Sequence, residues 1–315
     1  MQVAVTSNKK HFLTIGSWSQ KEIKHVLAKA HELKAMQKSG IIQQDLKGKI
    51  LGMIFEKSST RTRVSFEAGM LQLGGDAIHL KSDDLQLGRG ESIEDTAKVL
   101  SQYVDVLMIR TYGHEIIERF AASADIPVIN GLTDEHHPTQ VMADLLTIEE
   151  YKGDLSNVKV AYIGDGNNMA HSFIEAAAKV GMELAIATPP GYEPNKTIMQ
   201  EVLQEAKQTG ATITITNDPT QAVVDADVIV TDVWASMGQE EQQQERLQTF
   251  AAFQVNETLC SFAKSDYIFM HCLPAHREEE VTTSIIDGPH SVVFEEAQNR
   301  LHIQKAILHY VLNYK

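Results

Sequence analysis

Apolar residues along the chain form either short continuous runs or longer segments in which they recur every three to four positions. A segment of the second kind follows Ser19 and Glu22, whose spacing is that of a capping box. Ile23, Val26 and Leu27 then recur at helical period. We therefore expect an amphipathic helix near the N-terminus.

The continuous apolar runs predict buried strands, and the segments between them predict helices. The predicted strands are 49–55, 105–110, 127–130, 158–163, 184–187, 211–215, 228–231 and 267–270. The predicted helices after the N-terminal one include 64–73, 115–124, 138 to about 151, and one that ends near 180. Strands that alternate with helices predict an α/β fold whose mainly parallel sheets carry helices on both faces.

The length of 315 residues, of which 43% are hydrophobic, is enough for two ordinary cores. The strand at 158–163 restarts the alternation after a long helix. We therefore predict two domains, each with its own parallel sheet.

The charge and the hydropathy pattern limit the classes of partner. A net charge of -14 disfavours nucleic acid and anionic membrane surfaces. No secretory signal is seen at the N-terminus, and no apolar run approaches the roughly 18 residues of a membrane span. Cys260 and Cys272 are too few for a disulfide framework. We therefore expect a cytoplasmic protein that binds any anion through a local basic cluster.

The segment Ser58–Arg63 has the composition of a phosphate site. It holds two serines, two threonines and two arginines between a predicted strand and a predicted helix. A helix N-terminus offers unpaired N–H groups, and guanidinium groups bind phosphate with parallel hydrogen bonds. The alternative is ordinary N-capping with arginines in surface ion pairs.

A second polar segment begins the helix predicted from Pro138. His136, His137 and Gln140 lie there, and a histidine and a glutamine at a helix start can donate to a carbonyl and to phosphate oxygens. The spacing does not favour a metal site, because helical metal ligands usually stand four residues apart. We expect one of the two histidines to be structural.

Two further candidates follow predicted strands in the second half. Cys272 comes directly after one strand, where it is a nucleophile, a proton acceptor or an inert buried thiol. Asp232 comes after another, where it binds an ammonium group or forms an Asx turn. The residues by themselves leave both choices open.

A glycine-containing turn, Gly164–Asn168, joins a strand to a helix as in dinucleotide-binding folds. Met169 stands where the third glycine is required, and the next strand lacks the acidic residue that binds ribose. We therefore expect no nicotinamide cofactor. Asn167 and Asn168 are suited to a carboxylate or to simple capping.

The combination of motifs resembles the aspartate/ornithine carbamoyltransferase family from about Lys49 to the C-terminal helix. The matching segments are Ser-Thr-Arg-Thr-Arg at 59–63, His-Pro-Thr-Gln at 137–140, Asp-Gly-Asn-Asn at 165–168, Asp-Val-Trp-Ala-Ser-Met-Gly at 232–238, His-Cys-Leu-Pro at 271–274 and Asn-Arg-Leu-His at 299–302. The Ser-Met-Gly segment makes the resemblance closest to members whose acceptor is ornithine.

The resemblance implies a domain organisation and a set of site residues. A carbamoyl phosphate domain would comprise 1–150 together with a returning C-terminal helix at about 298–315, and an ornithine domain would comprise 151–297. The implied carbamoyl phosphate residues are Ser59, Thr60, Arg61, Thr62, Gln86, Arg110, His137, Gln140, Cys272, Leu273 and Arg300. The implied ornithine residues are Asn168, Asp232, Ser236 and Met237. The implied catalytic residues are Cys272, Arg110, His137 and Asp232.

The resemblance also implies a reaction, an assembly and two rival functions. The reaction would convert carbamoyl phosphate and L-ornithine to L-citrulline and phosphate in arginine metabolism, in the biosynthetic direction, without a metal or an organic cofactor. The chain would form a homo-oligomer, a trimer in which Gln86 reaches the adjacent subunit. The rivals are transfer to another amine, such as putrescine or N-acetylornithine, and a non-catalytic regulator that binds carbamoyl phosphate.

Overall fold

The computed structural model describes residues 9–81, 90–235 and 243–314. Two compact units make up the chain, the first from Met1–Thr139 with Arg300–Lys315 and the second from Gln140–Asn299. Helices α5 and α12 each contribute residues to both units. No helix within the described residues is long and apolar enough to cross a bilayer.

The first unit is built on a parallel sheet of four strands in the order β2-β1-β3-β4. The strands are β1 (Ile50–Phe55), β2 (Asp76–Lys81), β3 (Val106–Arg110) and β4 (Val128–Leu132). β1 and β3 are almost wholly buried, whereas β2 is a partly exposed edge strand. Continuous apolar runs therefore marked the central strands and not the edge.

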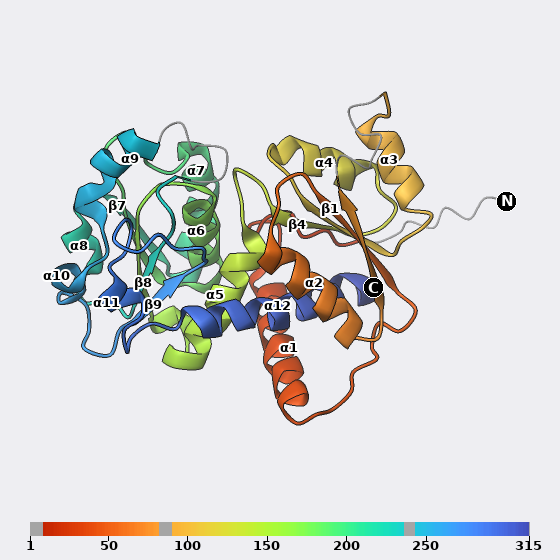
Figure 1. Cartoon of the computed structure of the whole chain (residues 1–315), viewed down its shortest axis with the longest axis horizontal. Helices are drawn as coiled ribbons and strands as arrows, with labels where there is room; N and C mark the ends of the chain where they lie inside the picture. The colour runs from red at the N-terminus through yellow and green to blue at the C-terminus, as the bar shows by residue number, and fades with distance from the viewer. Residues whose placement is uncertain (1–8, 82–89, 236–242, 315) are drawn as a thin grey trace. The chain divides into compact units, whose positions relative to one another are not determined.

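Helices cover both faces of this sheet, as Figure 1 shows. α3 and α4 pack on one face through a core that includes Ala97, Ile117 and Phe120. The other helices of the unit are α1, α2 and the end of α12. The bounds are α1 (Gln20–Lys38), α2 (Thr60–Gln72), α3 (Ile93–Leu100), α4 (His114–Ser123) and α12 (Val293–Asn313).

The C-terminal helix belongs to the first unit from Arg300 onward, as predicted. Lys305 Nζ donates to Gln37 Oε1 at 3.1 Å and to Gln72 Oε1 at 3.2 Å. These bonds join α12 to α1 and α2. A Cβ added at Gly69 would lie 3.1 Å from Lys305 Cγ, so the glycine lets α12 approach α2 closely.

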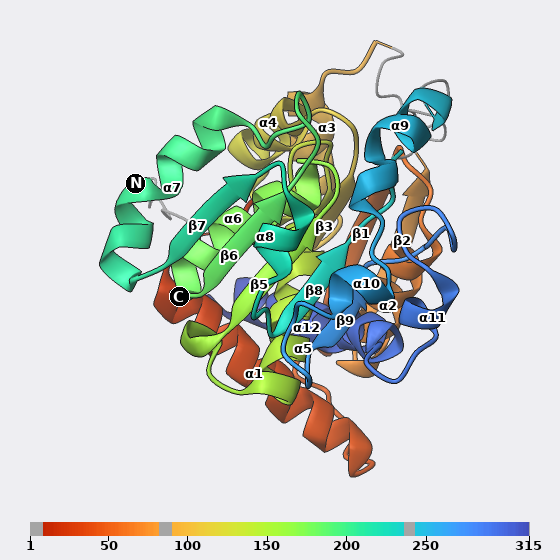
Figure 2. The ribbon, with the colours of Figure 1, turned by 90° about the vertical axis from the view of Figure 1, so that its left-hand side faces the viewer.

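The second unit has a parallel sheet of five strands in the order β7-β6-β5-β8-β9, which Figure 2 shows. Its strands are β5 (Lys159–Ile163), β6 (Glu183–Ala187), β7 (Thr212–Thr216), β8 (Val228–Thr231) and β9 (Ile268–His271). Its helices are the main part of α5 (Pro138–Lys152), α6 (Asn168–Val180), α7 (Lys196–Thr209), α8 (Pro219–Val223), α9 (Gln243–Phe250), α10 (Glu257–Cys260), α11 (Thr283–Ile286) and the start of α12. Two such sheets flanked by helices confirm the predicted α/β class.

Candidate active site

The first group of predicted residues lies where the strand order of the first unit reverses. β2 and β3 lie on opposite sides of β1, and Phe55 at the end of β1 is in register with Arg110 at the end of β3. Open α/β sheets bind ligands at the carboxyl ends of strands at such a point. Helix α2 begins immediately after β1, so its N-terminus lies at this edge.

The N-terminus of α2 begins at Thr60, four residues earlier than the apolar pattern predicted. Ser59 is its N-cap and accepts a hydrogen bond from the Thr62 backbone N–H at 3.2 Å. The Thr62 hydroxyl in turn accepts from Arg300 Nη2 at 2.7 Å. The capping alternative therefore holds for Ser59, and a guanidinium group from α12 lies in the same first turn.

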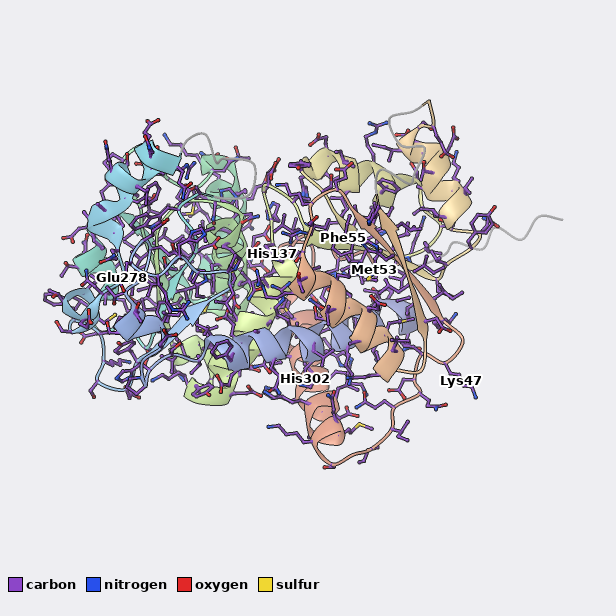
Figure 3. All side chains as sticks on the ribbon, viewed as in Figure 1. Lys47, Met53, Phe55, His137, Glu278 and His302 are labelled. Atoms are coloured by element: carbon purple, nitrogen blue, oxygen red, sulfur yellow. The ribbon has the colours of Figure 1, made fainter. Side chains whose placement is uncertain are left out.

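His137 lies among three guanidinium groups. It is buried at the start of α5, where Figure 3 labels it. Burial and the positive charges of Arg300, Arg110 and Arg61 hold its pKa well below the usual value of 6.5. A neutral imidazole can donate one N–H to a substrate oxygen without adding a further charge. The cluster therefore combines concentrated positive charge with a neutral donor.

His136 has a different environment from its neighbour. Its ring packs 4.8 Å from that of His114, and its backbone N–H donates to Thr133 Oγ1 at 3.2 Å. These contacts tie the β4–α5 connection to α4. The structure thus gives His136 a packing role and places His137 with the arginines.

Lys57 is a buried cation that sequence reasoning missed. It is 6% exposed, forms an ion pair with Asp134 and lies 4.2 Å from the centroid of the Tyr112 ring. The Asp134 carboxylate balances its charge. A lysine directly after a buried strand and directly before Ser58 was the only signal in the sequence.

The second group lies at the corresponding reversal in the second unit, between β5 and β8. Asn167 follows β5 and caps α6, and Asp232 follows β8. Asn167 Nδ2 donates to Asp232 Oδ2 at 2.9 Å. A Cβ on Gly166 would lie 2.4 Å from Pro194 N, so this turn requires glycine for a close backbone approach.

Asp232 joins the ends of three strands, because Cys272 follows β9. The Cys272 thiol donates to Asp232 Oδ1 at 3.1 Å, and Val233 N–H donates to the same oxygen at 2.8 Å. Together with Asn167, these donors occupy three of the roughly four acceptor positions of a carboxylate. The carboxylate therefore retains acceptor capacity for one more donor.

The Cys272 thiol is protonated in this environment. Burial raises its pKa well above the usual value of 9.0, and the negative charges of Asp232, Glu296 and Asp144 act in the same direction. A thiol of this kind donates a hydrogen bond and is a poor nucleophile. Of the three roles left open by the sequence, the geometry disfavours that of nucleophile.

The turn after Cys272 is held by His271. Leu273 has a positive φ of 57°, and its N–H donates to His271 Nδ1 at 2.8 Å. His271 Nε2 therefore carries the proton and faces Glu280 Oε1 at 3.2 Å. Both ring nitrogens are engaged in shaping this turn.

Gln140 lies beside two buried carboxylates. Its Nε2 donates to Asp144 Oδ1 at 2.8 Å and to Glu296 Oε1 at 2.9 Å, and the other Glu296 oxygen accepts from His271 N–H at 2.8 Å. The sequence predicted that Gln140 donates to a carbonyl or phosphate oxygen. In the structure its nitrogen donates to the two acids instead.

The Glu/Gln-rich segment predicted at 238–246 contains one buried residue. The prediction was a solvated loop or helix start, and α9 does begin at Gln243. Arg246, however, is 7% exposed and its Nη1 donates to Asp165 Oδ2 and to Trp234 O, each at 2.7 Å. Composition alone did not distinguish this inward arginine from its polar neighbours.

The described residues thus bring the predicted site into two groups, one in each unit. Thr62, Arg61, Arg110, His137 and Arg300 gather in the first. Gln140, Asp232 and Cys272 lie in the second, where Asn168 is the first residue of α6. Gln86, Ser236 and Met237 lie outside the described residues.

Three atoms of metal-ligand type also occur in the second group. Atoms of Asp232, His271 and Cys272 lie within 4.8 Å of one another, as do atoms of His276, Glu279 and Glu280. In the first set the thiol is protonated and both imidazole nitrogens are hydrogen-bonded. A metal would have to displace these bonds.

Comparisons with known proteins place both units in one family. The carbamoyl-P binding domain of aspartate/ornithine carbamoyltransferase matches residues 10–150, and the Asp/Orn binding domain matches residues 156–311. The ornithine carbamoyltransferase of Anoxybacillus flavithermus is 59% identical over 98% of both chains. That of Bacillus subtilis is 59% identical over 96% of this chain and 94% of the relative.

A solved structure agrees with the sequence comparison. Ornithine carbamoyltransferase from Pyrococcus furiosus superposes with a TM-score of 0.95 at 51% identity, covering 99% of this chain and 100% of that one. The chain belongs to the aspartate/ornithine carbamoyltransferase family.

Proposed function

We propose that this protein is an ornithine carbamoyltransferase, which transfers the carbamoyl group of carbamoyl phosphate to the δ-amine of L-ornithine. The products are L-citrulline and phosphate. The observation that carries the proposal is the cluster of Arg61, Arg110 and Arg300 around a neutral His137 at the first turn of α2. The names of the relatives support ornithine as the acceptor.

The first unit provides the groups that suit the phosphate end of the donor. The Ser59–Thr62 turn offers hydroxyl and backbone donors at a helix N-terminus, and Arg61 and Arg300 add positive charge. Arg110 and His137 donate to the carbamoyl oxygen, where charge develops in the tetrahedral intermediate. Preorganised donors of this kind are each worth about 3–4 kcal/mol of transition-state stabilisation.

The second unit provides the groups that suit the acceptor. Asp232 receives the α-ammonium at its remaining acceptor position, and Asn168 at the start of α6 donates to the α-carboxylate. Ser236 and the backbone of Met237 complete the ornithine set. Cys272 and the backbone of Leu273 contact the carbamoyl group.

The chemical step requires a neutral amine, although an alkylammonium has a pKa near 10.4. The δ-nitrogen forms a bond to the carbamoyl carbon, and the bond from that carbon to the phosphate oxygen breaks. The proton that the amine loses passes to Asp232 by way of the Cys272 thiol, which already donates to that carboxylate. Arg61 and Arg300 balance the charge on the departing phosphate.

The proposal extends to the assembly and the cell. The chain works in the cytoplasm, in arginine biosynthesis, as a homotrimer in which Gln86 reaches the neighbouring site. The family resemblance supports the trimer. Sedimentation equilibrium tests it, since a monomeric species with full activity would contradict a site completed by a neighbouring chain.

One assay tests the function against its rivals. The protein is incubated with carbamoyl phosphate and, in turn, ornithine, putrescine, N-acetylornithine and aspartate, and the ureido product is measured. We expect product with ornithine. Turnover of a different acceptor alone would overturn the choice of ornithine, and binding of carbamoyl phosphate without any product would favour a regulator.

A further inference from the structure

The buried acids beside Gln140 constrain its side-chain amide. Asp144 and Glu296 are 0% and 1% exposed, and both accept from the same nitrogen, Gln140 Nε2. An ionised carboxylate can accept hydrogen bonds and cannot donate them. An amide turned the other way would place Oε1 against two carboxylates, so only one orientation is compatible with the pair.

Glu296 is itself held in place by the backbone. Its second oxygen accepts from His271 N–H at 2.8 Å, at the end of β9. A backbone N–H cannot reverse its polarity, so this oxygen must remain an acceptor. Glu296 therefore transmits a fixed polarity from β9 to the amide of Gln140.

We propose that Asp144 and Glu296 are positioning residues that present Gln140 Oε1 to the NH2 of the donor's carbamoyl group, and so select carbamoyl phosphate over acyl phosphates. This inference rests on the proposed function. A carbamoyl group and an acetyl group differ by NH2 in place of CH3. An acceptor oxygen favours the first, because only NH2 donates, and leaves a buried acceptor unsatisfied with the second.

Amide substitutions in the acid pair reverse the polarity without changing its shape. In Glu296→Gln, the oxygen of the new amide is required by His271 N–H, so its NH2 faces Gln140. In Asp144→Asn, the new amide can turn either oxygen or nitrogen toward Gln140. The double variant therefore favours a reversed Gln140, whereas Asp144→Asn alone keeps the native orientation.

The experiment measures binding by calorimetry with two stable analogues of the donor and with inorganic phosphate. Phosphonoacetamide carries the NH2 group, and phosphonoacetone carries CH3 in its place. We expect the native protein to prefer the amide. The preference should fall about tenfold, equivalent to about 1.4 kcal/mol, in the double variant and remain in Asp144→Asn, while phosphate affinity stays within about twofold throughout.

Thr147→Val is the matched control for the packing of α5 against α12. Thr147 is buried one helical turn after Ala143 and accepts from Asn299 Nδ2 at 2.9 Å, so the variant removes a bond between the two helices without touching Gln140. The control should keep the native preference.

The outcomes separate this inference from the proposed function. An unchanged preference in the double variant, or an equal loss of affinity for all three ligands, overturns the positioning role while ornithine carbamoylation by the native protein persists. A native protein that forms no citrulline overturns the proposed function itself.

Discussion

The two units share a parallel α/β plan but surround their buried functional groups with opposite charge. In the first unit, three guanidinium groups lower the pKa of His137. In the second, three carboxylates raise the pKa of Cys272. In both cases burial acts in the same direction as the surrounding charges. The comparison shows that each unit keeps its central group neutral, so that the net field remains for a substrate of opposite charge.

The largest effect should come from removing positive charge in the first unit. Arg61→Gly should lower kcat/KM for carbamoyl phosphate about 10³-fold, or about 4 kcal/mol, because it removes a donor to the phosphate. Arg63→Gly is the matched control, since Arg63 is exposed and pairs with Glu67 on the same helix. Steady-state assays with circular dichroism to confirm folding provide the measurement, and equal losses in the two variants would contradict the assignment.

Removing negative charge in the second unit should have the next largest effect. Asp232→Asn should lower ornithine turnover about 100-fold, or about 2.7 kcal/mol, and leave phosphate binding intact. It should also speed alkylation of Cys272, because the Asp232 charge contributes to its raised pKa. Kinetics and mass mapping of alkylated peptides measure both effects.

The control for this variant lies at the other end of the same strand. Asp227 precedes β8, is 8% exposed and pairs with Lys264 at 2.7 Å. Asp227→Asn should leave the alkylation rate of Cys272 unchanged. A slower alkylation in Asp232→Asn than in the native protein would contradict the electrostatic account.

A third test concerns a buried cation of the first unit away from the arginine cluster. Burial lowers the pKa of Lys305 from 10.5 to about 8, so the folded state binds its proton more weakly than the unfolded state. The native free energy of unfolding should therefore rise with pH between about 8 and 10.5.

Lys305→Met should remove this dependence. We expect it to stabilise the fold by about 2 kcal/mol at pH 7, with the gain shrinking toward pH 10.5, as measured by urea unfolding. Lys98→Met on the exposed face of α3 is the control and should stay within about 0.5 kcal/mol of the native value at all pH values. Destabilisation by Lys305→Met at pH 7 would contradict a costly buried charge.

The smallest effect concerns His137. Its lowered pKa means that below about pH 6.5 the unfolded chain binds a proton that the folded protein does not. Stability should therefore fall with acidification, by about 1 kcal/mol from this residue between pH 6.5 and 5.5. His137→Gln should show a shallower slope in urea unfolding over that range, and an identical slope would show that the arginines do not act on this ring.

The central strands and the strand-end motifs could be predicted from the sequence because their signals are local. The edge strand β2 was missed, because it is half-exposed and carries Asp76 and Lys81 at its ends. Helix α3 was also missed, although Ser92 caps it and accepts from Asp95 N–H. That capping pattern was a signal that could have revealed it.

The partners that tune the site were harder to predict. Asp144 stands four residues after Gln140 on one helix, so helical spacing could have indicated their contact. Glu296 meets Gln140 across 156 residues of chain, and Asn167 meets Asp232 across 65. No local pattern specifies such pairs, because the sheet order brings them together.

The bond between Arg300 and Thr62 has a consequence for the order in which the protein is made. These residues are 238 positions apart. At a synthesis rate of about 5–20 residues per second, a ribosome needs roughly 12–50 s to pass from one to the other. During that interval the nascent first unit has its sheet and its α2 turn but lacks the guanidinium group of Arg300. The arginine cluster is therefore completed only when the last segment of the chain joins the first.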